Sequence, residues 1–171
     1  VYNENYLQPD MPVGVEEGIV KGIYRFREAS TSITGGNPVE VHLFGSGSIM
    51  QQVLDAQNEL AAKGIAADVW SVTSYNLLYR DAAECVSWNR EHPEADSRTP
   101  YIETALSGTR GIFVAVTDYM KVLPASIAQW VPGKLACLGT DGYGLSESRE
   151  DLRDYFGINS ASIVKTVESL M

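Results

Sequence analysis

Two early segments of the chain alternate hydrophobic and polar positions. Residues 22–27 (Gly-Ile-Tyr-Arg-Phe-Arg) and 39–44 (Val-Glu-Val-His-Leu-Phe) both alternate in this way, which is typical of half-buried strands. Between them, residues 30–38 are rich in Ser, Thr, Gly, Asn and Pro. This pattern predicts an antiparallel hairpin with a long loop.

From residue 39 onwards, short apolar stretches alternate with longer stretches whose apolar residues have helical spacing. Such alternation predicts βαβ units, in which a mainly parallel sheet carries helices on both faces. The expected fold class is therefore α/β. The strand and helix pairs are 39–44 with 48–63, 67–72 with 76–91, 111–116 with 119–131, and 135–139 with 149–156, and residues 162–171 also have helical spacing.

Two of the predicted helices begin with a capping-box sequence. Ser48 is followed by Gln51, and Ser148 by Asp151. Each serine hydroxyl can therefore accept a hydrogen bond from a free N–H group of the first helical turn. Among the later strands, the stretch that begins at Gly111 is more continuously apolar than the one that begins at Ala67. We expect the Gly111 strand to lie nearer the centre of the sheet.

The first part of the chain differs from the rest. Residues 1–21 show little periodicity and include the helix breakers Pro9, Pro12, Gly14 and Gly18, which indicates a connecting arm. The length of 171 residues fits one domain. We expect residues 1–21 to lead from a missing upstream domain, and residues 22–171 to form one α/β domain that is truncated at its C-terminus.

Composition and charge narrow the classes of protein. Hydrophobic residues make up 44% and charged residues 20% of the chain, as in an ordinary folded domain. The net charge of −9 repels nucleic-acid phosphates and anionic lipids. No apolar run reaches the roughly 20 residues that span a bilayer. Two cysteines, Cys85 and Cys137, do not make a disulfide framework, so we expect reduced thiols in a cytoplasmic protein.

Small or polar residues follow four of the predicted strands. In open α/β sheets, ligands bind beyond the carboxyl ends of the strands. We therefore expect a ligand crevice at this edge, lined by Ser46, Gly47, Ser48, Asp118 and Asp141. The alternative is that these loops only turn the chain and cap helices. Asp118 and Asp141 would then be N-caps rather than a paired-carboxylate site.

The residues themselves reveal no complete catalytic, cofactor or metal site. The stretch from Gly45 to Met50 lacks the third glycine of a dinucleotide fingerprint, and no acid follows at the required distance. It also lacks the lysine of a phosphate-binding loop and the Gly-x-Ser-x-Gly frame of a hydrolase nucleophile. His42 and His92 have no partner at metal-ligand spacing, so we interpret both as structural or surface histidines.

Several segments, taken in order along nearly the whole chain, resemble the last third of the bacterial homodimeric pyruvate dehydrogenase E1 family. The chain departs from the family at two places: it has a tyrosine at position 143, where the family suggests Phe, and a different sequence at 107–111. The resembling segments include Asn3-Glu-Asn-Tyr6, Gly45-Ser-Gly-Ser-Ile49, Asp68-Val-Trp-Ser-Val-Thr-Ser74, Trp88-Asn89 with His92-Pro93, Thr117-Asp-Tyr-Met-Lys121 and Leu138-Gly-Thr-Asp-Gly-Tyr-Gly144.

This resemblance implies a transketolase-like C-terminal domain, a three-layer α/β/α fold whose first strand is antiparallel. It implies a parent enzyme that decarboxylates pyruvate and reductively acetylates the lipoyl group of dihydrolipoyl acetyltransferase (E2). Thiamine diphosphate and Mg²⁺ would bind to upstream domains, so no catalytic, cofactor-binding or metal-binding residue carries over. The implied partners are a second E1 subunit and E2, and the chain alone is expected to be inactive.

Other interpretations remain open from the sequence. The chain could be a small-ligand-binding or regulatory module that uses the carboxyl-edge crevice. It could also be an interaction domain that acts alone. Related parents, such as 2-oxoglutarate or branched-chain E1 enzymes, share the general domain plan, although residues 3–6 and 140–144 resemble the pyruvate enzyme more closely.

Overall fold

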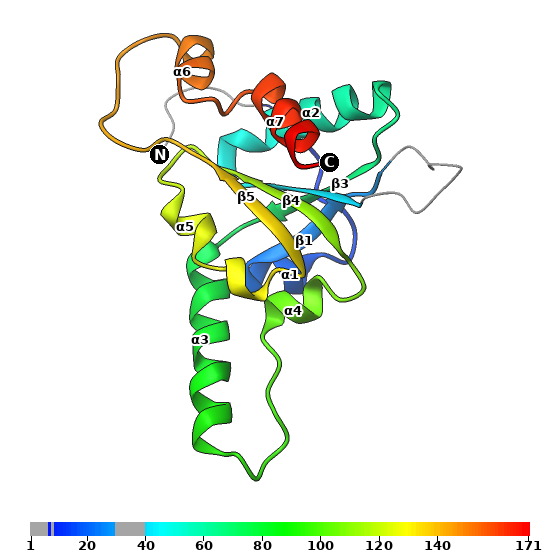
Figure 1. Ribbon diagram of the computed structural model, residues 1–171, viewed down its shortest axis with the longest axis vertical. Coiled ribbons are helices and arrows are strands. Elements are labelled where there is room, and N and C mark those ends of the chain that lie inside the picture. Colours follow the sequence, from blue (N-terminus) through cyan, green and yellow to red (C-terminus); the bar gives the residue numbers. More distant parts are fainter. Residues whose placement is uncertain (1–6, 8, 30–39) are drawn as a thin grey trace.

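The computed structural model describes residues 7, 9–29 and 40–171 (Figure 1). Its centre is a five-stranded sheet with the order β1-β3-β2-β4-β5. β2, β3, β4 and β5 are mutually parallel where they pair, and β1 is antiparallel to β3. The expected α/β fold with an antiparallel first strand is confirmed. The strands are β1 (Ile23–Arg27), β2 (Val41–Gly45), β3 (Ala67–Val72), β4 (Gly111–Val116) and β5 (Gly133–Leu138).

The predicted hairpin between the first two strands is wrong. β1 pairs with β3, with Ile23 opposite Val72, and β2 lies between β3 and β4. Both edges of β2 are therefore occupied, and its five residues are all buried. β2, not β4, is the central strand, which also corrects the expectation for the Gly111 strand. The predicted loop of the hairpin, residues 30–38, and the opening residues 3–6 lie outside the described residues.

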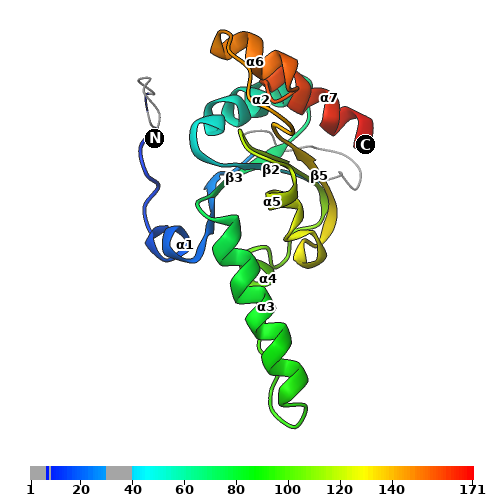
Figure 2. The same ribbon diagram turned by 90° about the vertical axis from the view of Figure 1, so that its left-hand side faces the viewer.

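Helices cover both faces of the sheet and complete three layers (Figures 1 and 2). The predicted helix over 119–131 is divided into α5 and a 3₁₀ turn, Ala128–Trp130. One face carries α2 (Met50–Ala62) and α7 (Ser160–Leu170), the other carries α3 (Tyr75–Glu91), α4 (Tyr101–Ala105) and α5 (Val122–Ala125), and α1 (Glu16–Lys21) and α6 (Arg149–Tyr155) lie at the margins.

The two faces of the sheet make two separate hydrophobic cores. Neighbouring residues of a strand point to opposite faces, so Leu43 packs under α2 and α7 while Phe44 packs under α3. Leu60 and Ile163 join the first core, and Leu78 joins the second; all three are fully buried. Each such side chain stabilises the fold by about 1.5–3 kcal/mol through burial.

The start of α6 and the start of β4 each depend on one particular residue. Ser148 accepts a hydrogen bond from the Asp151 N–H group (3.2 Å), as its capping box predicts. At Gly111 the backbone has φ +108, and a Cβ atom there would lie 2.3 Å from the Glu40 carbonyl oxygen. The position therefore needs glycine for two reasons: its backbone conformation, and the close approach of the Glu40 backbone.

The longest helix, α3, projects from the body of the domain, and residues 92–100 return alongside it (Figures 1 and 2). The Asn89 side chain joins the two parts through hydrogen bonds with the Arg98 N–H (2.7 Å) and carbonyl (2.9 Å) groups. The Trp88 ring stacks on His92 at 4.5 Å and lies against the Arg98 guanidinium at 4.1 Å. We call α3 with residues 92–100 the α3 arm. Local contacts thus hold its far end together.

Candidate functional site

The chain reverses its direction of winding between β2 and β4. From β2 it passes to β3 on one side, and after β3 it crosses to β4 on the other side and then to β5. Ligand crevices of open α/β sheets form at this kind of reversal, beyond the carboxyl ends of the two strands. Here those ends are followed by Ser46–Ser48 on β2 and by Thr117–Asp118 on β4. The expected edge of the sheet is therefore also its topological switch point.

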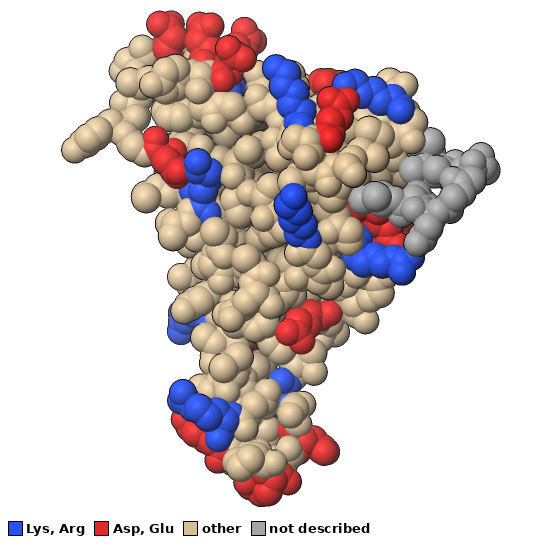
Figure 3. Space-filling view, in the orientation of Figure 1, with Lys and Arg blue, Asp and Glu red and all other residues tan. Residues whose placement is uncertain are grey.

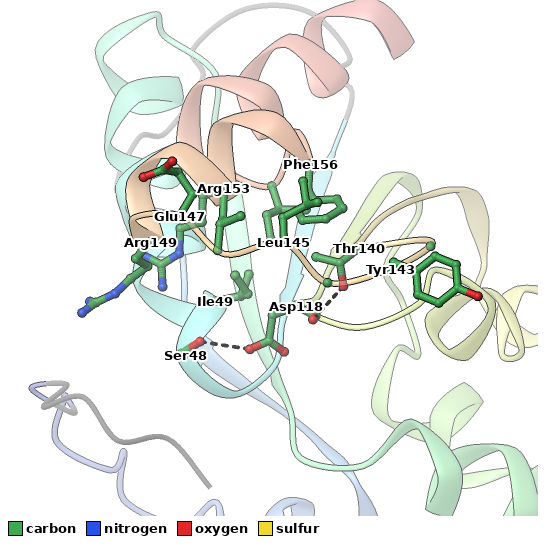
Figure 4. A pocket seen from close by; sticks show the side chains of 14 residues that line it. Ser48, Ile49, Asp118, Thr140, Tyr143, Leu145, Glu147, Arg149, Arg153 and Phe156 are labelled. Carbon is green, nitrogen blue, oxygen red and sulfur yellow. Dashed lines mark hydrogen bonds between the residues drawn. The ribbon is translucent and has the colours of Figure 1, made fainter.

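A cavity of about 370 Å³ lies at this edge. Its floor consists of polar residues that follow three strands: Ser48, Asp118 and Thr140. The segment after β5 and the residues in and just after helix α6 supply the apolar part of the lining, which consists of Leu145, Leu152, Phe156 and Ile158. In Figure 4 Leu145 and Phe156 lie above Asp118. We call this cavity the carboxyl-edge crevice. Its size is within the range of small-molecule sites, about 300–1,000 Å³.

Hydrogen bonds organise the floor of the crevice. The Ser48 hydroxyl donates to Asp118 Oδ2 at 3.2 Å, and the Thr140 hydroxyl donates to the Asp118 carbonyl oxygen at 2.8 Å (Figure 4). Ser48 lies in the 3₁₀ turn Gly47–Ile49, and α2 has no side-chain N-cap among the described residues. The capping prediction for Ser48 is therefore wrong, because its hydroxyl bonds across the crevice floor instead.

The other predicted crevice residues have different positions. Ser46 is buried; its hydroxyl donates to Thr117 (3.3 Å) and accepts from the Tyr119 hydroxyl (3.0 Å). Gly47 has φ +57, which glycine tolerates, and starts the 3₁₀ turn. Neither residue is among those that line the cavity. Both support the turn that presents Ser48.

Asp141 belongs to a separate ion pair outside the lining of the crevice. Its Oδ1 atom accepts from the Lys121 N–H group at 3.0 Å, and Oδ2 lies 3.0 Å from Lys121 Nζ. Hydrogen bonds from the backbone and side chain of Lys121 lower the pKa of the Asp141 carboxyl group. The pair links the segment after β5 to the start of α5. Among the described residues, Asp141 thus pairs with Lys121 rather than with a second carboxylate.

The sequence interpretation missed the residues that α6 contributes. Arg149 and Arg153 line the crevice, and Arg153 is only 8% exposed. In Figure 4 both lie near Glu147, whereas Leu145 and Phe156 lie nearer Thr140. A charged residue in a short amphipathic helix usually faces solvent. Nothing in the local pattern therefore marked Arg153 as buried.

The rings of His42 and His92 both pack against aromatic side chains. Burial lowers the pKa of His42, whose ring stacks on Phe113 at 4.6 Å and whose Nδ1 atom accepts from Trp70 Nε1 at 3.3 Å. His92 stacks on Trp88 in the α3 arm. Within residues 7, 9–29 and 40–171, no group of three His, Cys, Asp or Glu side chains could hold a metal ion.

The crevice does not fit thiamine diphosphate with Mg²⁺. Mg²⁺ requires octahedral oxygen ligands, usually carboxylates together with the phosphates. Only Asp118 and Glu147 of the lining are carboxylates, and Asp118 already accepts the Ser48 hydroxyl.

No helix in the described part of the chain is long and apolar enough to cross a membrane.

Comparison with known proteins places the chain in a family. Residues 22–159 match the transketolase-like TK C-terminal domain family. The pyruvate dehydrogenase E1 component of Pseudomonas aeruginosa is 46% identical over 96% of this chain, and those of Escherichia coli K12 and Mycobacterium tuberculosis are 43% and 40% identical over 95% and 99%. The chain spans 18% of the length of each of these relatives.

Solved structures show the same fold at low sequence identity. Transketolase from Campylobacter jejuni aligns with a TM-score of 0.58 at 18% identity, covering 94% of this chain and 20% of that one. A split-gene transketolase, described as an inactive β4 tetramer, aligns with a TM-score of 0.55 at 17% identity, covering 86% of this chain and 41% of that one. The chain therefore belongs to the transketolase-like C-terminal domain family and corresponds to the C-terminal domain region of bacterial pyruvate dehydrogenase E1 components.

Proposed function

We propose that the chain is the C-terminal structural and dimer-contact domain of a cytoplasmic pyruvate dehydrogenase E1. The observation that carries this proposal is the 40–46% identity to three such enzymes across at least 95% of the chain. The whole enzyme would decarboxylate pyruvate with thiamine diphosphate and Mg²⁺ bound to other domains, and would acetylate the lipoyl group of E2. Residues 1–21 would connect this domain to the one upstream.

In this proposal the chain itself carries out no chemistry. The crevice supplies no Mg²⁺ ligand set, and the Asp118 carboxylate is hydrogen-bonded to Ser48. We expect this chain, incubated with pyruvate, thiamine diphosphate and Mg²⁺, to reduce no electron-accepting dye. The complete E1 of Escherichia coli serves as the positive control. Dye reduction above the protein-free rate would contradict the inactive role.

The α3 arm supports the dimer-contact part of the proposal. Tyr79 and Val86 are 44% and 52% exposed, and with Ala83 and Arg90 they border one groove beside Trp130. Their spacing of four, three and four residues keeps these side chains on one face of α3. We call Tyr79, Ala83, Val86 and Arg90 the α3 stripe. Exposed apolar side chains arranged in a row are typical of protein contacts.

The order of residues along the α3 stripe is self-complementary. If two copies pair with antiparallel α3 helices, Ala83 faces the partner's Val86 and Tyr79 faces the partner's Arg90, because both pairs share one midpoint. A two-fold interface requires this reciprocity. The partner's Arg90 could then lie over the Tyr79 ring as a cation–π contact. The proposed occupant of the stripe is therefore a second copy of this chain.

Sedimentation equilibrium tests this contact. The wild-type chain is expected to associate into dimers, and Val86→Glu should shift it to monomers, because the new charge would be buried at the centre of the contact. Leu77→Glu is the matched control, since Leu77 is an exposed apolar residue of α3 outside the stripe. A wild-type monomer at the highest soluble concentration would contradict the proposed contact.

A second candidate function is a small-ligand-binding or regulatory module. The specific observation in its favour is the cavity of about 370 Å³ at the topological switch point, with a hydrogen-bonded floor and an apolar wall. A ligand that binds the folded chain must raise its unfolding temperature. Thermal unfolding with candidate metabolites tests this function.

A further inference from the structure

We propose that the carboxyl-edge crevice binds a small organic acid, with its carboxylate or phosphate at Arg153, a hydroxyl group on the Ser48–Asp118 floor and an apolar body against α6. This inference rests on the second proposed function and names the ligand class of that site. It is carried by three features of the lining: a cation, a floor of hydrogen-bond acceptors and an apolar wall.

The cation of the lining is the guanidinium group of Arg153. The residue as a whole is 8% exposed, and no hydrogen bond or ion pair of its side chain occurs within the described part of the chain. Arginine stays protonated in proteins, so this guanidinium group offers its N–H donors to the crevice. A carboxylate or phosphate in the crevice would accept two parallel hydrogen bonds from it.

The floor calls for a donor on the ligand. The Ser48 hydroxyl proton is directed to Asp118 Oδ2 and the Thr140 hydroxyl proton to the Asp118 carbonyl oxygen. Each of these two hydroxyl oxygens can still accept a hydrogen bond. A ligand hydroxyl group matches these acceptors, whereas a second anionic group beside Asp118 would be repelled.

The wall sets the rest of the ligand. The apolar residues of the lining are Leu145, Leu152, Phe156 and Ile158, and in Figure 4 Leu145 and Phe156 lie above Asp118. Apolar surface of this kind favours an aromatic or branched aliphatic group over a second polar one. An anionic head, an adjacent hydroxyl group and an apolar body together describe a hydroxy acid or a phosphate ester of similar size.

The probes that test the proposal are 3-phenyllactate, its neutral amide 3-phenyllactamide, and phenyl phosphate. Isothermal titration of this chain should show the acid binding about tenfold or more tightly than the amide, as expected for hydrogen bonds to a charged group. Arg153→Met should remove that difference. Arg80→Met, at an exposed position of α3, should keep it. The ratio of phenyllactate to phenyl phosphate affinity distinguishes a carboxylate from a phosphate ligand.

Each failure has a different meaning. If the acid and the amide bind equally, the acid class is wrong while the crevice still binds ligands. If none of the probes binds, both this inference and the ligand-binding function are overturned. Circular dichroism checks that Arg153→Met folds. If it does not fold, Arg153→Lys, which keeps the charge but loses the two-pronged geometry, should reduce the preference for the acid over the amide.

Discussion

The carboxyl-edge crevice and the α3 arm are built on opposite principles. The crevice gathers polar residues from three strands around a cavity and buries a charged residue, Arg153. The α3 arm is convex, exposes apolar residues such as Val86, and is held at its end by contacts within residues 88–98. Figure 3 shows acidic side chains gathered over α6 and at the far end of the arm.

This difference assigns different partners to the two regions. A concave site with converging polar groups suits a small molecule, whereas a projecting helix with an apolar stripe suits another protein surface. The first depends on a preformed sheet edge, and the second depends only on one helix and its root in the core. Substitutions in the two regions should therefore differ in how much they change stability and in which property they change.

The largest expected effect separates the root of α3 from its outer half. Leu78 is fully buried in the core beneath the helix, whereas Val86 is 52% exposed. Leu78→Ala should lower the free energy of unfolding by about 2–5 kcal/mol. Val86→Ala should change it by less than about 0.5 kcal/mol. Urea unfolding at concentrations where the chain is monomeric measures both, and equal losses would show that the outer half is also part of the core.

The next effect compares the thiol of Cys137 in the sheet with the thiol of Cys85 in the α3 arm. Burial raises the pKa of Cys137 in β5 to about 11 from an ordinary value of 9.0, so its thiolate fraction near pH 8 should be about a hundredfold below that of a free thiol. Burial also raises the pKa of Cys85 in α3. Although Cys85 is the less exposed thiol, alkylation followed by mass spectrometry should find Cys137 modified more slowly, because the raised pKa leaves so little of it as thiolate. Faster modification of Cys137 would break the comparison.

A smaller, local effect is expected at the end of the α3 arm. Trp88→Ala removes the stacking on His92 and the cation–π contact with Arg98. We expect a loss of about 1–2 kcal/mol, since the ring is only partly buried. Amide hydrogen exchange should accelerate in residues 89–98 and stay unchanged at the crevice. Faster exchange at β2 or β4 would show that the two regions are coupled.

The smallest effect concerns the ion pair beside the crevice. Lys121 lowers the pKa of Asp141 below its ordinary value of 3.8, so the charged carboxylate stabilises the fold above that pH. This contribution is lost as the pH falls through the lower pKa of the folded state. The stability difference between wild type and Asp141→Asn, measured by urea unfolding, should therefore be constant at neutral pH and shrink below pH 3.8. A difference that grows in acid would contradict this assignment.

Periodicity predicted the elements of the fold better than their pairing. Two-residue alternation predicted the first strand, and the succession of short apolar stretches and helical stretches predicted the later ones. All were placed within a few residues. The alternation placed β1 beside β2, however, because a two-residue period identifies a strand but not its neighbour. The structure instead inserts β1 next to β3, which leaves β2 flanked on both edges. The best-buried strand is thus not the most continuously apolar one.

Of the five residues expected at the carboxyl edge, two line the cavity found there, and its role as a ligand site stays a prediction. Ser48 and Asp118 line the crevice and bond to each other, as expected of residues that follow adjacent parallel strands. Asp141 instead pairs with Lys121, because the contacts of a side chain after a strand depend on where the next loop runs. Arg153 lies in α6, and only the packing of that helix over the strand ends buries it.

By itself, the sequence determined the fold class, the parallel layers and the polar character of the carboxyl edge, because these follow from local periodicity and the chemistry of strand ends. The hairpin pattern and the family resemblance both predicted an antiparallel first strand, although the hairpin gave it the wrong neighbour. Tertiary structure alone decided the strand order, the depth of the crevice and the burial of Arg153. Those features depend on contacts between residues far apart in the chain, such as Ser48 with Asp118, and a local pattern carries no information about which distant segments meet.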